Sequence, residues 1–280
     1  MTHPAISPGA VAVVTGGAAG IGLAAACRFA AMGLRVCIAD LGAARLDRAE
    51  VLLREAGAAD VLTVETDVSR LDDVQALERA VSARFGGTDV LMNNAGIQPG
   101  SDMYGTGGTW ARVLGVNLWG VIHGAQVFVP GMIARGRPGL ILNTGSKQGI
   151  TTPPGDPAYN VSKAGVKAFT EALAHDLRGT AKELLTAHLL IPGFVFTDLT
   201  AQGRTEKPAA AWTPEQVVEF MLERLGFGDF YILCPDNDVP RRLDERRILW
   251  AAGDIVENRP ALSRWHPDHA AAFAAYLAEG

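Results

Sequence analysis

The sequence TGGAAGIG, residues 15–22, lies between an apolar run that predicts a strand and a pattern that predicts a helix. A glycine-rich turn leading into a helix presents free backbone N–H groups and the positive end of the helix dipole, which together favour a pyrophosphate. Gly16 lets the chain turn, Gly20 lets the backbone approach a phosphate, and Gly22 lets the helix pack closely on the strand. The stretch therefore predicts a dinucleotide-binding turn.

Strand and helix patterns alternate from this turn onward. Short apolar runs predict strands at residues 10–15, 34–39, 61–65, 89–92, 140–142, 187–191 and 230–233. Helical patterns fill the gaps at residues 21–32, 44–56, 71–85, 110–132, 158–178 and 214–225. Because most of the runs are apolar throughout, both faces of each strand should be buried, as in a parallel sheet covered by helices. We predict an α/β fold, a single doubly wound Rossmann-type domain over residues 1–235, with a mostly parallel seven-stranded sheet and helices on both faces.

The alternation stops in the C-terminal extension, residues 236–280. This segment contains a charged helix-like piece, two prolines and a last short helix. In that helix Phe273, Tyr276 and Leu277 fall at i, i+3 and i+4, which makes an apolar stripe. We predict that the extension packs on its own domain or on a neighbouring subunit.

Composition excludes several classes of protein. The net charge is −5 and the basic residues are scattered, so no nucleic-acid partner is expected. The N-terminus lacks the pattern of a secretory signal, and no apolar stretch predicts a membrane span. The three cysteines are widely spaced, which fits a reducing cytoplasm. His266 and His269 have no further ligand cluster nearby, so no metal site is expected.

Acidic residues follow two of the predicted strands. Asp40 ends the second strand, where a carboxylate can accept hydrogen bonds from both ribose hydroxyls of NAD and repel the 2′-phosphate of NADP. Gly17 and Leu41 supply no compensating cation, and Arg45, one helical turn further on, is expected to face solvent. Asp67, after the third strand, either contacts adenine or merely precedes the next helix. NAD is therefore the predicted cofactor.

A second group of motifs lies near the middle of the chain. Asp156 and the proline after it make a favourable helix start, which places Tyr159 and Lys163, at i and i+4, on one face of the first two turns. Ser146 follows a predicted strand, thirteen residues before Tyr159. Each feature has an ordinary structural explanation by itself, since such a pair is often only a surface contact. Their combination behind a nucleotide-binding turn favours a catalytic group.

The TGxxxGxG turn, the segment Asn93-Asn94-Ala95-Gly96, and Ser146 with the sequence YNVSK, residues 159–163, together resemble the short-chain dehydrogenase/reductase family. The branch implied has a compact domain and a YxxxK catalytic helix, and the resemblance runs from about residue 8 to residue 200. It covers most of the predicted Rossmann-type domain and none of the extension.

The resemblance implies a role for each matching residue. Tyr159 would be the general acid/base, Ser146 would polarise the substrate oxygen, and Lys163 would bind the nicotinamide ribose and lower the tyrosine pKa. Asn117 would support a proton-relay water. The implied cofactor-binding residues are Gly16, Ala19, Gly20, Ile21, Gly22, Asp40, Leu41, Asp67, Val68, Asn94, Ala95, Gly96, Tyr159, Lys163, Pro192, Gly193, Val195 and Thr197.

These observations predict an NAD-dependent oxidoreductase that interconverts a secondary alcohol and a ketone. An NADPH-dependent carbonyl reductase is the main alternative, because it differs only in cofactor and direction. A nucleotide-sensing protein without catalysis is less favoured, because such a protein is expected to have lost Tyr159 or Lys163. The expected partner is a small alcohol or ketone, in a cytoplasmic homotetramer that pairs the helices over residues 110–132 and 158–178.

Substrate identity has little support in the sequence. Candidate pocket residues near the catalytic motifs are Gln98, Gln148, Pro154 and Phe194, with Phe196 and Lys147 beside them. A lysine that pointed inward would favour an anionic substrate, but Lys147 is expected to point outward because lysine is almost never fully buried.

Overall fold

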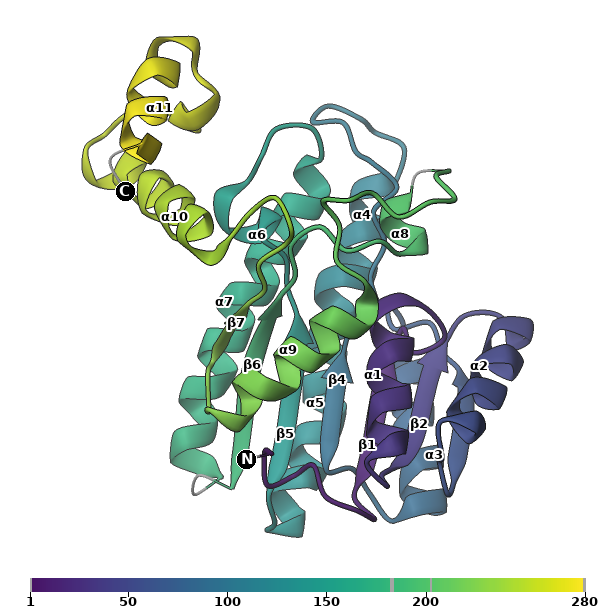
Figure 1. Ribbon diagram of the computed structural model, residues 1–280. Helices are drawn as coiled ribbons and strands as arrows, with labels where there is room; N and C mark the ends of the chain where they lie inside the picture. Colours follow the sequence, from purple (N-terminus) through teal and green to yellow (C-terminus); the bar gives the residue numbers. More distant parts are fainter. Residues whose placement is uncertain (1, 182–183, 202, 279–280) are drawn as a thin grey trace.

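A seven-stranded parallel sheet forms the centre of the molecule in the computed structural model, which describes residues 2–181, 184–201 and 203–278 (Figure 1). The strands are β1 (Val11–Thr15), β2 (Arg35–Asp40), β3 (Val61–Glu65), β4 (Val90–Asn93), β5 (Gly139–Thr144), β6 (Leu185–Ile191) and β7 (Tyr231–Leu233). Their order is β3-β2-β1-β4-β5-β6-β7, and every neighbouring pair is parallel. The predicted doubly wound fold is therefore confirmed. The strand order reverses between β1 and β4, and in such sheets ligands bind at the carboxyl ends of the strands beside this point.

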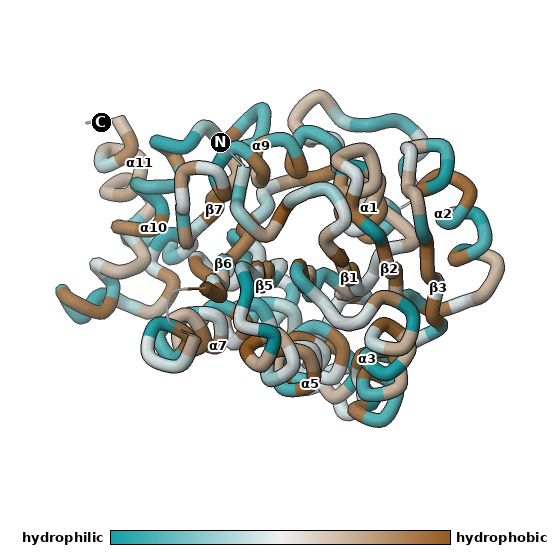
Figure 2. The backbone as a smooth tube through the Cα atoms, turned by 90° about the horizontal axis from the view of Figure 1, so that it is seen from below, coloured by the Kyte–Doolittle hydropathy of each residue, from teal (hydrophilic) through white to brown (hydrophobic). Residues whose placement is uncertain are grey.

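Helices cover both faces of the sheet, as the end-on view in Figure 2 shows. One layer contains α1 (Gly20–Ala31), α2 (Ala43–Glu55) and α9 (Pro214–Gly226), and the other contains α3 (Leu71–Phe85), α5 (Gly120–Arg135) and α7 (Pro157–Thr180). Alternate residues of β1 belong to the cores on opposite faces of the sheet: Val14 packs in the same core as Phe29, and Val13 packs in the same core as Phe128. Both faces of the central strands are thus buried, which explains why their sequences are apolar throughout.

The predicted helix over residues 110–132 is interrupted. Helix α4 (Thr109–Leu114) leads into a π-helical turn, η1 (Gly115–Trp119), and then into α5. The whole run, Thr109–Arg135, is the one helix among the described residues that is long and apolar enough by composition to cross a membrane. Its apolar side chains, including Phe128 and Met132, are buried in the core against the sheet, so we interpret the run as a core helix.

Smaller elements complete the described chain. They are α6 (Gln148–Thr151), α8 (Asp198–Ala201), α10 (Arg241–Val256), the 3-10 turns η2 (Ser263–Trp265) and η3 (Pro267–His269), and α11 (Ala270–Ala278). The Thr213 side chain and Gln216 form a capping box at the start of α9, which fixes where that helix begins.

The C-terminal extension projects from the sheet beside α6 and α7 (Figure 1). Its small core forms around Trp250, whose indole nitrogen donates to Ser263 Oγ at 2.7 Å. The ring centroids of Phe273 and Tyr276 each lie 5.2 Å from that of Trp250, and the Arg259 guanidinium lies 4.0 Å from the centroid of the same ring. The aromatic residues of the predicted stripe therefore pack within the extension itself.

The N-terminal segment is attached to β6 by two buried histidines. Because Asp229 O only accepts, the Nδ1 of His188, 2.8 Å away, carries the proton. Because Ala5 N–H donates to His3 Nδ1 at 3.2 Å, the proton of His3 is on Nε2 and is donated to Thr186 Oγ1 at 2.9 Å. The Thr186 hydroxyl can then donate to His188 Nε2 at 2.9 Å. Every donor and acceptor has a partner when both rings are neutral.

Burial and the neighbouring His188 lower the pKa of His3 to about 4, from an ordinary value of 6.5. Between pH 6.5 and about pH 4 His3 binds a proton in the unfolded chain but not in the folded chain. The folded protein therefore loses stability as the pH falls through this range. We expect the free energy of unfolding to fall by roughly 2 kcal/mol more in the parent than in His3→Leu between about pH 7 and pH 5, measured by urea denaturation. An equal loss in both proteins would contradict this linkage, and the exposed His175→Leu is the control.

Candidate active site

The glycine-rich turn joins β1 to α1 at the carboxyl edge of the sheet. Gly16 has a φ of +64°, a conformation that glycine adopts without strain. At Gly22 a Cβ atom would lie 2.1 Å from the Gly16 carbonyl oxygen, so a larger residue would displace the turn. The N-cap of α1 is Ala19, which makes no side-chain hydrogen bond to the helix. The first backbone N–H groups of α1 are therefore available for an anion.

Asp40 lies at the end of β2, beside this turn. Its Oδ2 accepts a hydrogen bond from Ala18 N–H at 2.9 Å, and its Oδ1 accepts one from Leu41 N–H at 2.8 Å. A carboxylate has further acceptor capacity, so both oxygens can still accept from a ligand. Arg45 is exposed, as predicted, and it also lines the same pocket.

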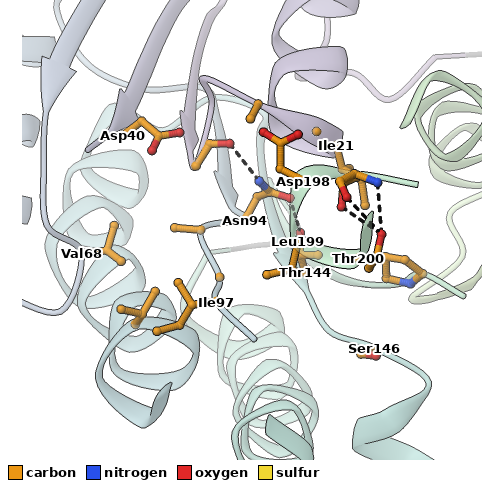
Figure 3. A pocket seen from close by; sticks show the side chains of 18 of the residues that line it. Ile21, Asp40, Val68, Asn94, Ile97, Thr144, Ser146, Asp198, Leu199 and Thr200 are labelled. Atoms are coloured by element: carbon orange, nitrogen blue, oxygen red, sulfur yellow. Dashed lines mark hydrogen bonds between the residues drawn. The ribbon is translucent and has the colours of Figure 1, made fainter. Parts of the chain in front are cut away.

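One pocket of about 450 Å³ extends from Asp40 to Ser146 (Figure 3), within the size range of small-molecule sites. Most of the predicted cofactor and catalytic residues line it: Gly16, Ala19, Gly20, Ile21, Asp40, Leu41, Asp67, Val68, Asn94, Ala95, Gly96, Ser146, Tyr159, Lys163, Pro192, Gly193, Val195 and Thr197. Gly22 and Asn117 do not line it. Besides Arg45, the pocket is lined by residues that were not predicted from the sequence: Ala39, Thr66, Ile97, Val116, Thr144, Gly145, Asp198, Leu199 and Thr200.

Tyr159 and Lys163 project from the first two turns of α7 toward the end of the pocket that holds Ser146. Both are almost fully buried, with 7% and 4% of their surface exposed. The Lys163 ammonium donates to Thr144 O at 2.8 Å and lies 5.7 Å from the centroid of the Tyr159 ring. Ser146 Oγ accepts from Gln148 N–H at 3.2 Å. Because this bond uses Ser146 Oγ only as an acceptor, the hydroxyl can still donate its own proton.

The pKa of Tyr159 is shifted in the direction opposite to the one expected from the sequence. Burial raises the pKa of Tyr159 to about 12, the hydrogen bond with Ser146 opposes this rise, and the charge of Asp156 adds to it. Burial also lowers the pKa of Lys163 to about 8. The expected lowering of the Tyr159 pKa by Lys163 is not found: desolvation of the phenolate is the largest effect on that pKa. The protein's own groups therefore hold Tyr159 protonated at neutral pH.

Asn117 lies in the π-helical turn and is fully buried. Its amide oxygen accepts from Ile97 N–H at 2.8 Å, and its amide nitrogen donates to Ile97 O at 2.9 Å and to Ser162 Oγ at 3.2 Å. Ser162 Oγ in turn donates to the backbone oxygen of Tyr159 at 2.7 Å. Asn117 thus connects the loop after β4 to the start of α7. It positions two walls of the pocket.

These features agree with comparisons to known proteins. A family model described as short chain dehydrogenase matches residues 10–208. The chain belongs to the short-chain dehydrogenase family. Among its relatives, 2-(R)-hydroxypropyl-CoM dehydrogenase of Xanthobacter autotrophicus is 36% identical over 202 residues, which cover 71% of this chain and 79% of the relative. The 1-deoxy-11-beta-hydroxypentalenate dehydrogenase of Streptomyces arenae is 35% identical over 267 residues, which cover 91% and 92% of the two chains.

A solved structure of this family is also similar to the chain. The crystal structure of a short-chain dehydrogenase/reductase from Burkholderia phymatum, in complex with NAD, is 33% identical to this short-chain dehydrogenase and matches it with a TM-score of 0.81. The match covers 90% of this chain and 96% of the other. Both relatives and this structure match well beyond the glycine-rich turn. The chain is therefore a member of an oxidoreductase family.

The residues present fit the dinucleotide that this family uses. The free N–H groups at the start of α1 suit a pyrophosphate, and the glycines of the turn leave space for it. Asp40 lines the pocket beside the turn, where its carboxylate could accept from an adenosine ribose, and Lys163 lines it near Ser146, where a nicotinamide ribose would be expected.

The substrate residues predicted from the sequence do not surround the pocket of this short-chain dehydrogenase. Gln98, Gln148, Pro154 and Phe194 are not among the residues that line the described pocket. Instead, Leu199 of the short helix α8 and its neighbours contribute (Figure 3). Four residues, Asp198–Ala201, are too few for a helical pattern to be visible in the sequence.

The prediction that Lys147 points outward is wrong. Its side chain is only 17% exposed, and its ammonium lies 3.2 Å from Asp236 Oδ2 and 2.6 Å from Asp244 Oδ2. Two carboxylates from the C-terminal extension provide the compensation that a buried lysine needs. With its charge already paired, Lys147 does not favour an anionic substrate.

We expect Gly22→Ala to weaken the binding of ADP-ribose by at least ~10-fold, because the added Cβ would displace the Gly16 carbonyl and distort the turn. Isothermal titration calorimetry measures this affinity. The control is Gly131→Ala in α5, where no atom lies within 4 Å of the added Cβ. A folded Gly22→Ala protein with the parent's affinity would contradict the assignment of the turn.

Proposed function

We propose that the protein is an NAD-dependent oxidoreductase that interconverts a secondary alcohol and a ketone, with Tyr159 as general acid/base. The observation that carries this proposal is the joint burial of Tyr159 and Lys163 at one end of a nucleotide-type pocket, with the Ser146 hydroxyl beside them. The relatives support it, since they are named as dehydrogenases, including a galactitol 2-dehydrogenase from Cereibacter sphaeroides that is 36% identical over 203 residues.

The side chains divide the chemistry among them. Ser146 accepts from Gln148 N–H and donates its own proton, so it can hold the substrate oxygen next to Tyr159. In the oxidation direction the Tyr159 phenolate takes the alcohol proton as the C–H hydride leaves; in reduction the phenol returns a proton to the carbonyl oxygen. When bound, the dinucleotide supplies the hydride acceptor or donor. Burial opposes the phenolate form of Tyr159, and a charged Lys163 nearby would reduce that cost during proton transfer.

Tyr159→Phe removes the proton donor and keeps the ring. We expect turnover of a good secondary alcohol to fall by at least ~100-fold, with ADP-ribose affinity unchanged, because general acid–base catalysis contributes on this scale. Steady-state kinetics with a panel of cyclic and aromatic secondary alcohols measures it. Tyr276→Phe, in the extension, is the matched control. Near-parental turnover by Tyr159→Phe would refute the mechanism.

The proposed preference for NAD rests on Asp40. Its carboxylate faces the pocket and would oppose the dianionic 2′-phosphate of NADP. Two observations favour the second candidate, an NADPH-dependent carbonyl reductase. Arg45 also lines the pocket and could pair with that phosphate, and the raised pKa of Tyr159 favours the protonated form that reduction requires. We favour NAD because Asp40 is fixed by two backbone hydrogen bonds, whereas Arg45 is exposed.

The cofactor proposal is tested by comparing kcat/KM for NAD and NADP. We expect the parent to favour NAD by at least ~30-fold, since a lost hydrogen bond to a charged group costs about 1.5–3 kcal/mol and repulsion adds to it. Asp40→Ser should reduce the preference, and Arg45→Ala should weaken only the use of NADP. Equal use of both cofactors by the parent would contradict the proposal, and an unchanged ratio in Asp40→Ser would show that Asp40 is not the selector.

We further propose a cytoplasmic homotetramer, paired through α5 and α7, with a Rossmann-type domain over residues 1–235 and an extension over residues 236–280. Two exposed apolar residues, Trp119 at the end of η1 next to α5 and Val161 in α7, support the pairing. Light scattering at micromolar concentration should give four times the monomer mass of 29.5 kDa.

A further inference from the structure

A buried cluster of three charges joins the C-terminal extension to the catalytic end of the pocket. Its members, which we call the Lys147 cluster, are Lys147, Asp236 and Asp244. The Lys147 ammonium lies 3.2 Å from Asp236 Oδ2 and 2.6 Å from Asp244 Oδ2, and both carboxylates are only 6% exposed. Lys147 belongs to the turn after β5, whereas Asp244 lies in the first turn of α10. The cluster therefore connects two segments about a hundred residues apart in the sequence.

The same cluster is bonded to the pocket wall. Asp236 Oδ2 also accepts from Phe194 N–H at 3.2 Å, and Lys147 N–H donates to Pro192 O at 3.3 Å. Between them, a Cβ on Gly193 would lie 2.5 Å from Asp236 Oδ2 and 2.8 Å from Lys147 Nζ. Pro192 and Gly193 line the pocket, so the charges sit directly behind its wall. The residue before Lys147 is Ser146, the proposed substrate-orienting hydroxyl.

The extension supplies charge without lining the pocket. Among the described residues, none beyond Thr200 contributes to the pocket's surface. Asp236 Oδ1 accepts from Val239 N–H at 2.8 Å, which fixes the start of the extension. Asn237 donates to Ala209 O at 2.6 Å and so holds the segment that precedes α9. The contacts of the extension with the catalytic end therefore run through backbone positions and through the Lys147 cluster.

Buried charges make this connection sensitive to the loss of a single group. With two carboxylates and one ammonium the cluster has an excess of one negative charge, which the Phe194 and Val239 N–H groups and the nearby positive charge of Arg247 help to compensate. Removing the ammonium would leave two neighbouring carboxylates with little solvent, which is strongly unfavourable. The carboxylates would then separate, take up water or share a proton, and each response weakens the contact between the extension and the turn that follows β5.

We propose that the Lys147 cluster positions Ser146 and the Pro192–Gly193–Phe194 turn, and that the extension is required for catalysis through these charges. The kinetic part of this inference rests on the proposed function; the positional part does not. Lys147, Asp236 and Asp244 are positioning residues, since they act through their neighbours. The adenosine end of the pocket, at Asp40, makes no contact with the cluster and should be unaffected.

The test compares Lys147→Met, Asp244→Asn and the double variant with the parent. Hydrogen–deuterium exchange, followed by mass spectrometry, reports on residues 145–151 and 192–197, and titration calorimetry reports on ADP-ribose. We expect Lys147→Met to speed exchange in both segments by at least ~10-fold, because opening of the wall becomes easier. In the same variant kcat/KM for the alcohol should fall by at least ~10-fold while ADP-ribose affinity stays within about twofold.

The double variant shows whether the effect of Lys147→Met comes from the uncompensated negative charge or from the changed packing of the side chain. It has one uncompensated carboxylate fewer than Lys147→Met, so it should recover part of the lost protection and turnover. Asp244→Asn alone keeps the Lys147–Asp236 pair and should fold normally, with about threefold faster exchange in the two segments, although the change lies in the extension. The control is Lys167→Met, which removes the ammonium of an i,i+4 pair with Glu171 that is about one-third exposed.

Unchanged exchange in Asp244→Asn, equal effects in Lys167→Met, or no recovery in the double variant would each overturn the proposal. Faster exchange with parental kcat/KM would overturn the positioning role. If the parent oxidised no alcohol at all, the proposed function would fail, while the exchange measurements would still decide whether the cluster holds the two segments.

Discussion

The ends of β1 and β4 are held together at the point where the strand order reverses, and the rest of the site depends on this contact. Thr15 Oγ1 accepts from the backbone N–H groups of Asn94 and Ala95, at 3.0 and 3.2 Å, and the Asn94 amide donates back to Thr15 O and Gly16 O, at 3.2 and 3.3 Å. Gly22 packs against the same atoms so closely that no side chain fits. The start of α1, the end of β2 and the loop after β4 therefore meet around one pocket. The nucleotide end of the site follows from this packing.

The catalytic end depends on burial. Helix α7 carries Tyr159 and Lys163 into an interior where neither the phenolate nor the ammonium is favoured, and the two pKa values move apart, to about 12 for Tyr159 and about 8 for Lys163. A buried pair of this kind responds strongly to any positive charge that enters the pocket, because the local dielectric is low. Under the proposed function, proton transfer by Tyr159 would therefore be coupled to the charge that the pocket holds.

Much of the fold and of the site could be predicted from the sequence, because strands buried on both faces and glycines in fixed positions leave clear patterns. The predicted strands agree with those observed to within a few residues at each end. Lys147 could not be predicted, because its partners Asp236 and Asp244 are distant in the sequence and only the fold brings them together. Helix α8 was too short to leave a pattern, and the π-helical turn at Asn117 reflects bonds to Ile97 that no local pattern records.

An ultraviolet titration of tyrosine ionisation, in the presence of NAD and of ADP-ribose, tests whether the ionisation of Tyr159 depends on charge in the pocket, with Tyr159→Phe as the blank. The two ligands share the adenosine end, but only NAD carries the cationic nicotinamide ring. We predict that a tyrosinate signal absent from Tyr159→Phe appears below about pH 10 with NAD, and that with ADP-ribose its midpoint stays at least ~2 pH units higher. The same midpoint with both ligands would contradict the account, because Tyr159 would then not sense charge in the pocket.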